Sequence, residues 1–163
     1  MTPTATARQP IVLDCDPGHD DALAILLAAA APSLELLAIT TVAGNQSLDK
    51  TTLNARRMCT VAGISGVPVA AGADRPLVRE PIVAPEIHGA SGLDGPAMGT
   101  PTVPLDPRHA VDVILEASRQ RPGMILVATG PLTNVATALA RDPALGGRLQ
   151  RIVLMGEIGR AHV

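Results

Sequence analysis

The sequence predicts an α/β fold in which helices flank an open, mostly parallel sheet. Apolar runs rich in β-branched residues alternate with longer segments of helical periodicity, as expected for successive β-α-β units. Polar clusters follow several of the apolar runs, and the carboxyl ends of parallel strands are where such sheets bind ligands. The 163 residues suit one domain, since domains usually have about 100–200 residues, and no repeat or linker divides the chain.

Five strands are expected, each a short apolar run between turn residues. Their largely apolar character fits a parallel sheet that is covered by helices. The predicted strands are residues 9–14, 36–42, 67–71, 124–128 and 151–155.

The first two helices are expected at residues 20–31 and 47–62. The first is apolar nearly all round and stops before Pro32, so we expect it to be buried against the sheet. The second ends at Gly63, because glycine commonly occupies the position that follows a helix.

The segment of residues 72–105 is rich in proline and glycine and has no clear periodicity. Loops of this length are usually functional or disordered. A third helix is expected to begin around Asp106 and Pro107, with the aspartate as its cap, and to end at the Pro-Gly pair of residues 122–123. The last helix is expected at residues 133–141.

The composition argues against several kinds of partner. A net charge of −2 with 17% charged residues provides no basic field, so we expect neither nucleic acid nor membrane as a partner. No Phe, Tyr or Trp is present to stack on a ligand. Cys15 and Cys59 lie far apart without metal or disulfide spacing, which favours a reduced, cytoplasmic setting. Residues 1–10 lack an apolar signal core and are expected to form a disordered tail.

Four aspartates fall within eight residues, between the first predicted strand and the first predicted helix. Carboxylates this close raise one another's pKa, so we expect a cation between them, and hard cations such as calcium or magnesium prefer oxygen ligands. Asp14 and Asp16 alternate at the strand end. Asp20 and Asp21 open the helix about 100° apart and should have different roles. Capping of the helix N-terminus is the alternative explanation.

Polar residues also follow two other predicted strands. Asn45 follows the second strand, and Thr129, Gly130 and Asn134 follow the fourth. Each of them could be an ordinary turn or cap residue. Because the carboxyl ends of parallel strands share one edge, their convergence there favours a binding site.

The stretch DCDPGHDDALAILLA resembles the N-terminal signature of the nucleoside hydrolases, the inosine/uridine-preferring family of calcium-dependent N-ribosidases. Further stretches agree with this family in the family's order: ITTVAGNQSLDKTTLNA, IHGASGLDGP, VATGPLTNVATAL and IVLMG. The resemblance covers residues 11–156, which we interpret as the N-terminal part of a nucleoside hydrolase domain.

The resemblance implies a calcium ion as cofactor and a role for each aspartate. Asp16 and Asp21 match the family's calcium-binding carboxylates, and Thr129 matches the residue whose main-chain carbonyl binds the metal. Asp20 matches the base that activates water. Asp14 is expected to support the turn or a ligand from outside the coordination sphere.

The resemblance also implies the substrate contacts and the reaction. Asn45 matches a residue near the ribose and the metal, and His88 matches a histidine near the substrate. A histidine in a loop is more often a surface residue, and the surrounding IHGASGLDGP match is what favours the ligand role. The implied reaction hydrolyses the N-glycosidic bond of a ribonucleoside to ribose and free base through an oxocarbenium-like state.

The chain is shorter than the family, so the resemblance predicts a truncated fold and an incomplete site. Residues 157–163, EIGRAHV, depart from the family's glycine-rich continuation and are expected to be a non-native tail. The full-length protein is expected to bind a small ribonucleoside and to form a homo-oligomer, whereas the 163-residue chain alone is expected to be inactive.

Two other functions are compatible with parts of this sequence. A phosphatase of the haloacid-dehalogenase type also places an Asp-x-Asp pair after its first strand. It needs a lysine from a later motif, however, and Lys50, the only lysine, lies in the second predicted helix. The other alternative is a non-enzymatic fragment that only binds metal.

Overall fold

A computed structural model describes residues 7–95 and 97–155 of the chain. In this part of the chain, six strands form one sheet in the order β4-β3-β2-β1-β5-β6, and all neighbouring strands are parallel. The predicted open, parallel α/β sheet is confirmed. The strands are β1 (Gln9–Cys15), β2 (Leu34–Thr41), β3 (Val69–Ala71), β4 (Leu105–Asp106), β5 (Met124–Ala128) and β6 (Leu149–Leu154).

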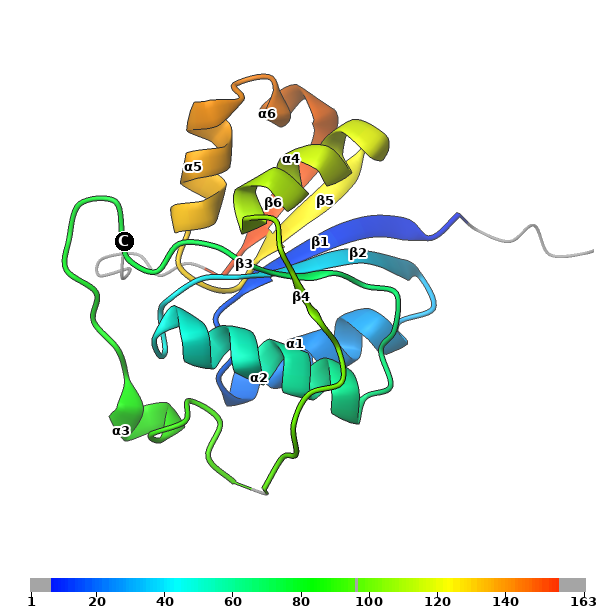
Figure 1. Ribbon diagram of the computed structural model, residues 1–163. Coiled ribbons are helices and arrows are strands. Elements are labelled where there is room, and N and C mark those ends of the chain that lie inside the picture. The colour runs from blue at the N-terminus through cyan, green and yellow to red at the C-terminus, as the bar shows by residue number, and fades with distance from the viewer. Residues whose placement is uncertain (1–6, 96, 156–163) are drawn as a thin grey trace, which may run out of the picture.

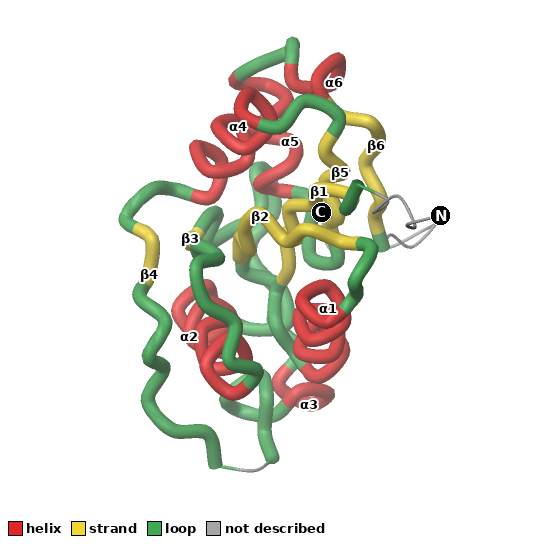
Figure 2. Tube along the Cα trace, turned by 90° about the vertical axis from the view of Figure 1, so that its right-hand side faces the viewer, coloured by secondary structure: helices red, strands yellow, loops and turns green. Residues whose placement is uncertain are grey.

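Helices cover both faces of the sheet. Helices α1 and α2 lie on one face, and α4 and α5 lie on the other (Figures 1 and 2). The strand order reverses between β1 and β5, because the chain moves outward from β1 to β4 and then returns to β5 on the other side. The helices are α1 (His19–Ala30), α2 (Leu48–Val61), α3 (Pro85–His88), α4 (Ala110–Gln120), α5 (Thr133–Arg141) and α6 (Leu145–Arg148).

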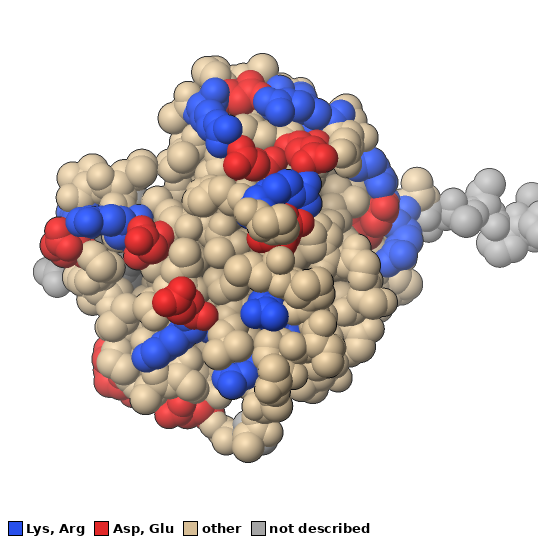
Figure 3. Space-filling model, in the orientation of Figure 1, with Lys and Arg blue, Asp and Glu red and all other residues tan. Residues whose placement is uncertain are grey.

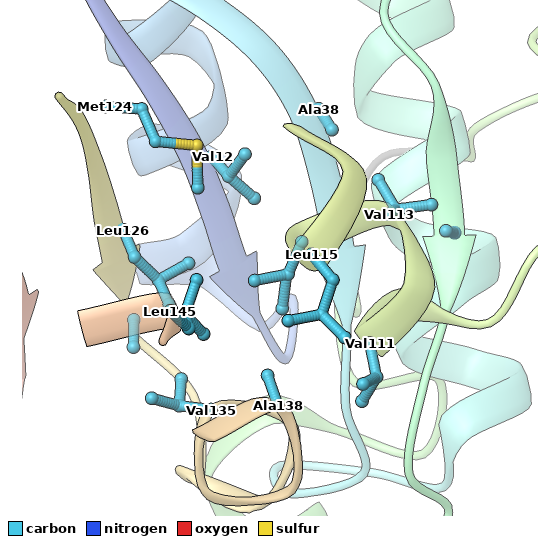
Figure 4. Packing of buried hydrophobic residues seen from close by; sticks show 13 residues of the cluster. Val12, Ala38, Val111, Val113, Leu115, Met124, Leu126, Val135, Ala138 and Leu145 are labelled. Carbon is cyan, nitrogen blue, oxygen red and sulfur yellow. The ribbon is translucent and has the colours of Figure 1, made fainter. Parts of the chain in front are cut away.

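The hydrophobic core has two layers that meet the two faces of the central strand β1. Ile11 and Leu13 point to the layer under α1 and α2, and Val12 between them points to the layer under α4 and α5. Burial of β1 on both faces brings its carboxyl end into the interior. Figure 4 shows the second layer, with labelled residues Val12, Ala38, Val111, Val113, Leu115, Met124, Leu126, Val135, Ala138 and Leu145.

Strand β1 begins at Gln9, as predicted for the strand, so Gln9 and Pro10 do not belong to the predicted disordered tail of residues 1–10. The Gln9 N–H donates to the Ser33 carbonyl at 2.7 Å. Successive N–H groups of a strand point to opposite sides, and the Gln9 N–H points toward β2, so the N atom of Pro10 faces β5. Pairing with β5 starts only at Ile11, so the missing N–H of Pro10 leaves no ladder bond unmade. Residues 1–6 and the predicted non-native tail at 157–163 lie outside the described residues.

The start of α4 also differs from the prediction. The helix begins at Ala110, and the Nδ1 atom of His109 accepts the capping bond from the Val111 N–H at 3.2 Å. Asp106 is not its cap, because Asp106 pairs with β3 and its Oδ1 accepts from the Arg108 N–H at 2.9 Å. The short elements β4, α3 and α6 were not predicted, since so few residues establish no periodicity.

Helix α1 packs against the sheet, as predicted, but it is buried on only one side. Ile25 and Ala28 are buried, whereas Leu23 is 68% exposed and Leu27 is 70% exposed. An apolar sequence alone therefore did not reveal which face of this helix meets the sheet.

The described surface shows mixed charge and no membrane-spanning element. Figure 3 shows Lys and Arg interspersed with Asp and Glu over the visible face. Across residues 7–95 and 97–155, no helix combines the length and apolarity that crossing a bilayer requires.

Candidate functional site

The candidate site lies where β1, β2 and β5 end, at the point where the strand order reverses. Open α/β sheets bind ligands at such a switch point, because the loops from the two neighbouring strands diverge there. Asp14, near the end of β1, lies between Thr40 of β2 and Ala128 of β5. The chain then passes through buried Asp16 and enters α1.

Asp14 is fully buried and acts as the connection between three elements. Its Oδ1 accepts from Thr40 Oγ1 at 2.6 Å and from Asn134 Nδ2 at 2.8 Å. Its Oδ2 is buried without a hydrogen-bond partner among the described residues. Burial raises the pKa of Asp14 from its usual 3.8 to about 6, although both hydrogen bonds lower it.

Asp16 and Asp21 form a buried pair across the turn between β1 and α1. The Asp16 N–H donates to Asp21 Oδ2 at 2.9 Å, and the two residues are 5% and 2% exposed. The Asn45 N–H donates to Asp16 Oδ2 at 2.7 Å. Burial, followed by the charge of Asp21, raises the pKa of Asp16 well above its usual range. A buried carboxylate whose ionisation is disfavoured in this way, with a second buried carboxylate beside it, provides a place for a cation.

Two glycines leave room for the Asp16 carboxylate. A Cβ atom at Gly44 would overlap Asp16 Oδ2, and one at Gly130 would lie 2.8 Å from Asp16 Oδ1. Gly44 follows β2 and Gly130 follows β5, so the loops from both neighbouring strands enclose this side chain. The carboxylate is therefore confined to one place by backbone on both sides.

Asn45 and His88 lie beside the same turn. Asn45 Nδ2 donates to the Asp16 carbonyl at 3.1 Å. A Cβ at Gly18 would lie 2.5 Å from His88 Nδ1 and 3.0 Å from Asn45 Nδ2, so both side chains pack against Gly18. The rings of His19 and His88 are stacked with centroids 5.7 Å apart. The long loop thus brings His88 to Gly18, in the turn that carries the aspartates.

The other two predicted residues lie at the edge of this cluster. Asp20 is exposed in the first turn of α1 and contributes to the raised pKa of Asp16. The Thr129 N–H donates to the Asp14 carbonyl at 2.9 Å, which holds the end of β5 next to the end of β1. The N-cap residue of α1 is Gly18, and no side chain makes a capping hydrogen bond there, so neither Asp20 nor Asp21 caps this helix.

A sequence model of the family described as inosine-uridine preferring nucleoside hydrolase matches residues 11–159. This chain belongs to that family. It is 52% identical over 148 residues to the pyrimidine-specific ribonucleoside hydrolase RihA of Salmonella arizonae, covering 90% of this chain and 48% of the relative. It is 51% identical to the protein of the same name from Shewanella sp. strain MR-7, and the match covers 91% of this chain and 47% of that relative. The family predicted from the sequence is confirmed.

Solved nucleoside hydrolases share the fold. The purine-preferring ribonucleoside hydrolase from Gardnerella vaginalis superimposes with a TM-score of 0.86 at 31% identity, covering 91% of this chain and 48% of that one. A plant nucleoside hydrolase superimposes with a TM-score of 0.85 at 33% identity, with the same coverage. The chain thus spans about half the length of the relatives it matches. Their names include both pyrimidine-specific and purine-preferring enzymes, so family membership does not define a base.

Nucleoside hydrolases are generally metal-dependent, and the residues of this site fit a hard cation. Within the described ranges 7–95 and 97–155, no three His, Cys, Asp or Glu side chains form a metal-binding group. To the predicted ligand set this chain contributes two carboxylates, Asp16 and Asp21, and the Thr129 carbonyl. The raised pKa of Asp16 and the unpartnered Oδ2 of Asp14 indicate a cluster with more negative charge than the described protein groups balance.

Two residues of this site were not assigned a role from the sequence. Thr40 binds Asp14 from the adjacent strand, and the parallel register would have revealed it once the strand neighbours were known. Asn134 was identified as a polar residue after the fourth predicted strand but given no partner. It is fully buried and binds Asp14, the Thr41 carbonyl and the Ala73 N–H.

Proposed function

We propose that the protein hydrolyses the N-glycosidic bond of ribonucleosides, and that this chain supplies the part of the site that binds a cation and activates water. The buried Asp16–Asp21 pair at the switch point is the observation that carries this proposal. The named relatives are ribonucleoside hydrolases, which supports the same reaction class. The phosphatase alternative is not favoured by these relationships.

We propose calcium as the cation, with the Asp16 and Asp21 carboxylates and the Thr129 main-chain carbonyl as its ligands. Carboxylate and carbonyl oxygens are the ligands that calcium prefers. When bound, calcium supplies positive charge that acidifies a water and offers coordination positions to ribose hydroxyls. Asp14 supports these ligands from β1, because its backbone carbonyl holds the Thr129 N–H in place.

Asp20 is the proposed general base. Its exposed position in the first turn of α1, next to the buried pair, suits a group that takes a proton from water at the substrate side. Water attacks the ribose carbon as the bond to the base breaks, and Asp20 accepts the water proton. The departing base keeps the electron pair of the broken bond and takes up a proton, which gives ribose and the free base. Asn45 and His88 are proposed to contact the ribonucleoside, since both side chains lie against Gly18 beside the aspartates.

Ribose release from inosine and uridine by the full gene product tests this proposal. We expect Asp20→Asn to lower kcat by about 10²- to 10⁴-fold, the usual contribution of a general base, with a smaller effect on KM. Asp49→Asn is the matched control, because Asp49 is also an exposed aspartate in the first turn of a helix. We expect a chelator to abolish turnover and added calcium to restore it. Turnover that ignores both the chelator and Asp20→Asn would refute the proposal.

We also propose a cytoplasmic setting, a small ribonucleoside as the partner, and a homo-oligomer for the full-length protein. Two free, buried cysteines, Cys15 and Cys59, support a reducing compartment. The 163-residue chain without further sequence is proposed to be inactive. Sedimentation and ribose release, measured on the chain and on the full gene product, test the assembly and the inactivity together.

A further inference from the structure

The turn that follows His88 is held by three side chains from one other segment. Its three successive carbonyl oxygens, those of Gly89, Ala90 and Ser91, each accept one hydrogen bond from this segment. The donors are Gln46 Nε2 at 3.0 Å, Lys50 Nζ at 2.6 Å and Asn54 Nδ2 at 3.0 Å, in the same order.

The spacing of the three donors explains how they act together. Lys50 and Asn54 are one helical turn apart on α2, so they share a face, and Gln46 lies just before the helix. Lys50 Nζ also donates to Gln46 Oε1 at 3.2 Å, which links the first two donors. Gln46 and Asn54 are buried, with 4% and 1% exposed. We name Gln46, Lys50 and Asn54 the α2 ladder.

The backbone N–H groups of the same turn are satisfied from the opposite direction. Asp94 accepts from the Ala90 N–H at 3.1 Å and from the Ser91 N–H at 3.0 Å. Gly92 has a φ of 81°, and a Cβ there would lie 2.8 Å from Gln46 Cγ. The carbonyls of the turn therefore face the α2 ladder closely, while its amides face Asp94.

The α2 ladder also connects this turn to the aspartates. Asn54 Nδ2 donates to the Pro17 carbonyl at 3.2 Å as well as to Ser91, so one amide group joins the aspartate turn to the long loop. His88 lies at the start of the held turn, and its ring packs against Gly18. A shift of the turn would move this ring relative to the aspartates.

We propose that Gln46, Lys50 and Asn54 are positioning residues that hold His88 beside the aspartate turn for contact with the ribonucleoside. This inference rests on the proposed function, because His88 is assigned there as a substrate contact. Asp20 and the metal ligands do not contact the α2 ladder through any hydrogen bond found in residues 7–95 and 97–155. Loss of the α2 ladder should therefore affect substrate binding more than the chemical step.

Hydrogen exchange of the amides of residues 89–92 tests whether the α2 ladder holds the turn. Lys50→Met and Asn54→Leu remove the donors while keeping similar side-chain size, and Lys50→Arg restores a charged donor. Arg56→Ala is the matched control, because Arg56 donates from the same helix to a different loop carbonyl, that of Val103, at 2.8 Å. We expect about fivefold faster exchange in each donor variant, the factor for one net hydrogen bond, and no change in Arg56→Ala.

Steady-state hydrolysis of inosine and uridine by the full gene product tests the consequence for His88. We expect Lys50→Met to raise KM severalfold with kcat nearly unchanged, Lys50→Arg to recover the wild-type KM, and Arg56→Ala to match wild type. Asn54→Leu should also raise KM severalfold, and it should lower kcat as well, because it removes the bond to the Pro17 carbonyl beside Asp16. Exchange rates or KM values in Lys50→Met and Asn54→Leu equal to those of Arg56→Ala would overturn the inference. If the wild-type product hydrolyses no ribonucleoside, the proposed function fails, and the exchange comparison still decides whether the α2 ladder holds the turn.

Discussion

Gly44→Ala is the substitution that most directly tests the confinement of Asp16. The new methyl group would overlap Asp16 Oδ2 and would lie 2.8 Å from two ring carbons of Pro131. Neither neighbour can easily move. The Pro131 ring has no rotamers to change, and Asp16 is 5% exposed with its Oδ2 held by the Asn45 N–H at 2.7 Å.

The expected destabilisation follows from these contacts. Forcing one extra methyl into a packed site costs about 1–3 kcal/mol. Displacing the Asp16 carboxylate also breaks the bond from Asn45, which is worth about 0.5–1.5 kcal/mol. We therefore expect Gly44→Ala to lower the free energy of unfolding by about 1.5–4.5 kcal/mol.

Urea denaturation in the presence of a chelator measures this loss without any contribution from bound metal. Gly146→Ala is the matched control, because no described atom outside its own helix and chain neighbours lies within 4 Å of the new Cβ. Gly146 lies in α6, so alanine there should stabilise the protein by about 0.5–1 kcal/mol. A Gly44→Ala protein whose stability stays within about 0.5 kcal/mol of wild type, the usual effect of a neutral surface change, would refute the packing argument.

Three further predictions concern other buried groups. In the presence of a chelator, the free energy of unfolding should fall as the pH rises from about 4 to about 6, because burial raises the pKa of Asp14 to about 6 and the folded state binds its proton more tightly than the unfolded state does. In urea titrations at these pH values, the Asp14→Asn protein should lose up to about 3 kcal/mol of this pH dependence. Asn134→Leu should lower the free energy of unfolding by about 3 kcal/mol in the same assay, because it removes hydrogen bonds to Asp14, the Thr41 carbonyl and the Ala73 N–H. A loss below about 1 kcal/mol would contradict the role of Asn134 in holding these groups together. Cys15 and Cys59 should resist iodoacetamide at pH 8 until urea unfolds the chain, because burial raises both thiol pKa values, that of Cys59 to about 11; mass spectrometry that finds rapid labelling of the native protein would contradict this.

Local patterns in the sequence were sufficient for most of the fold. The five predicted strands lie within two residues of the observed ones, and the helix at Thr133–Arg141 matches its prediction. These elements contain apolar runs or periodic apolar positions, and such patterns predict strands and helices from local sequence. The prediction was wrong at Asp106, where an aspartate before a helix can either cap the helix or bind a neighbouring residue. Its carboxylate binds Arg108 instead of capping α4.

The site shows the same division. The sequence by itself determined that four carboxylates gather at the end of the first strand, because adjacent residues on a chain cannot be far apart in space. It also identified Asn45, Thr129 and His88 through the family resemblance. The described contacts now place all of these around one turn.

Only the tertiary structure decided which carboxylates are buried and what holds the others in place. Asp16 and Asp21 are enclosed whereas Asp20 is exposed, because the turn of α1 directs consecutive side chains to different sides. The contacts from Thr40 and Asn134 to Asp14, and from the α2 ladder to the turn after His88, join residues that are distant in sequence. Such contacts depend on strand order and helix packing, which no local pattern of residues contains.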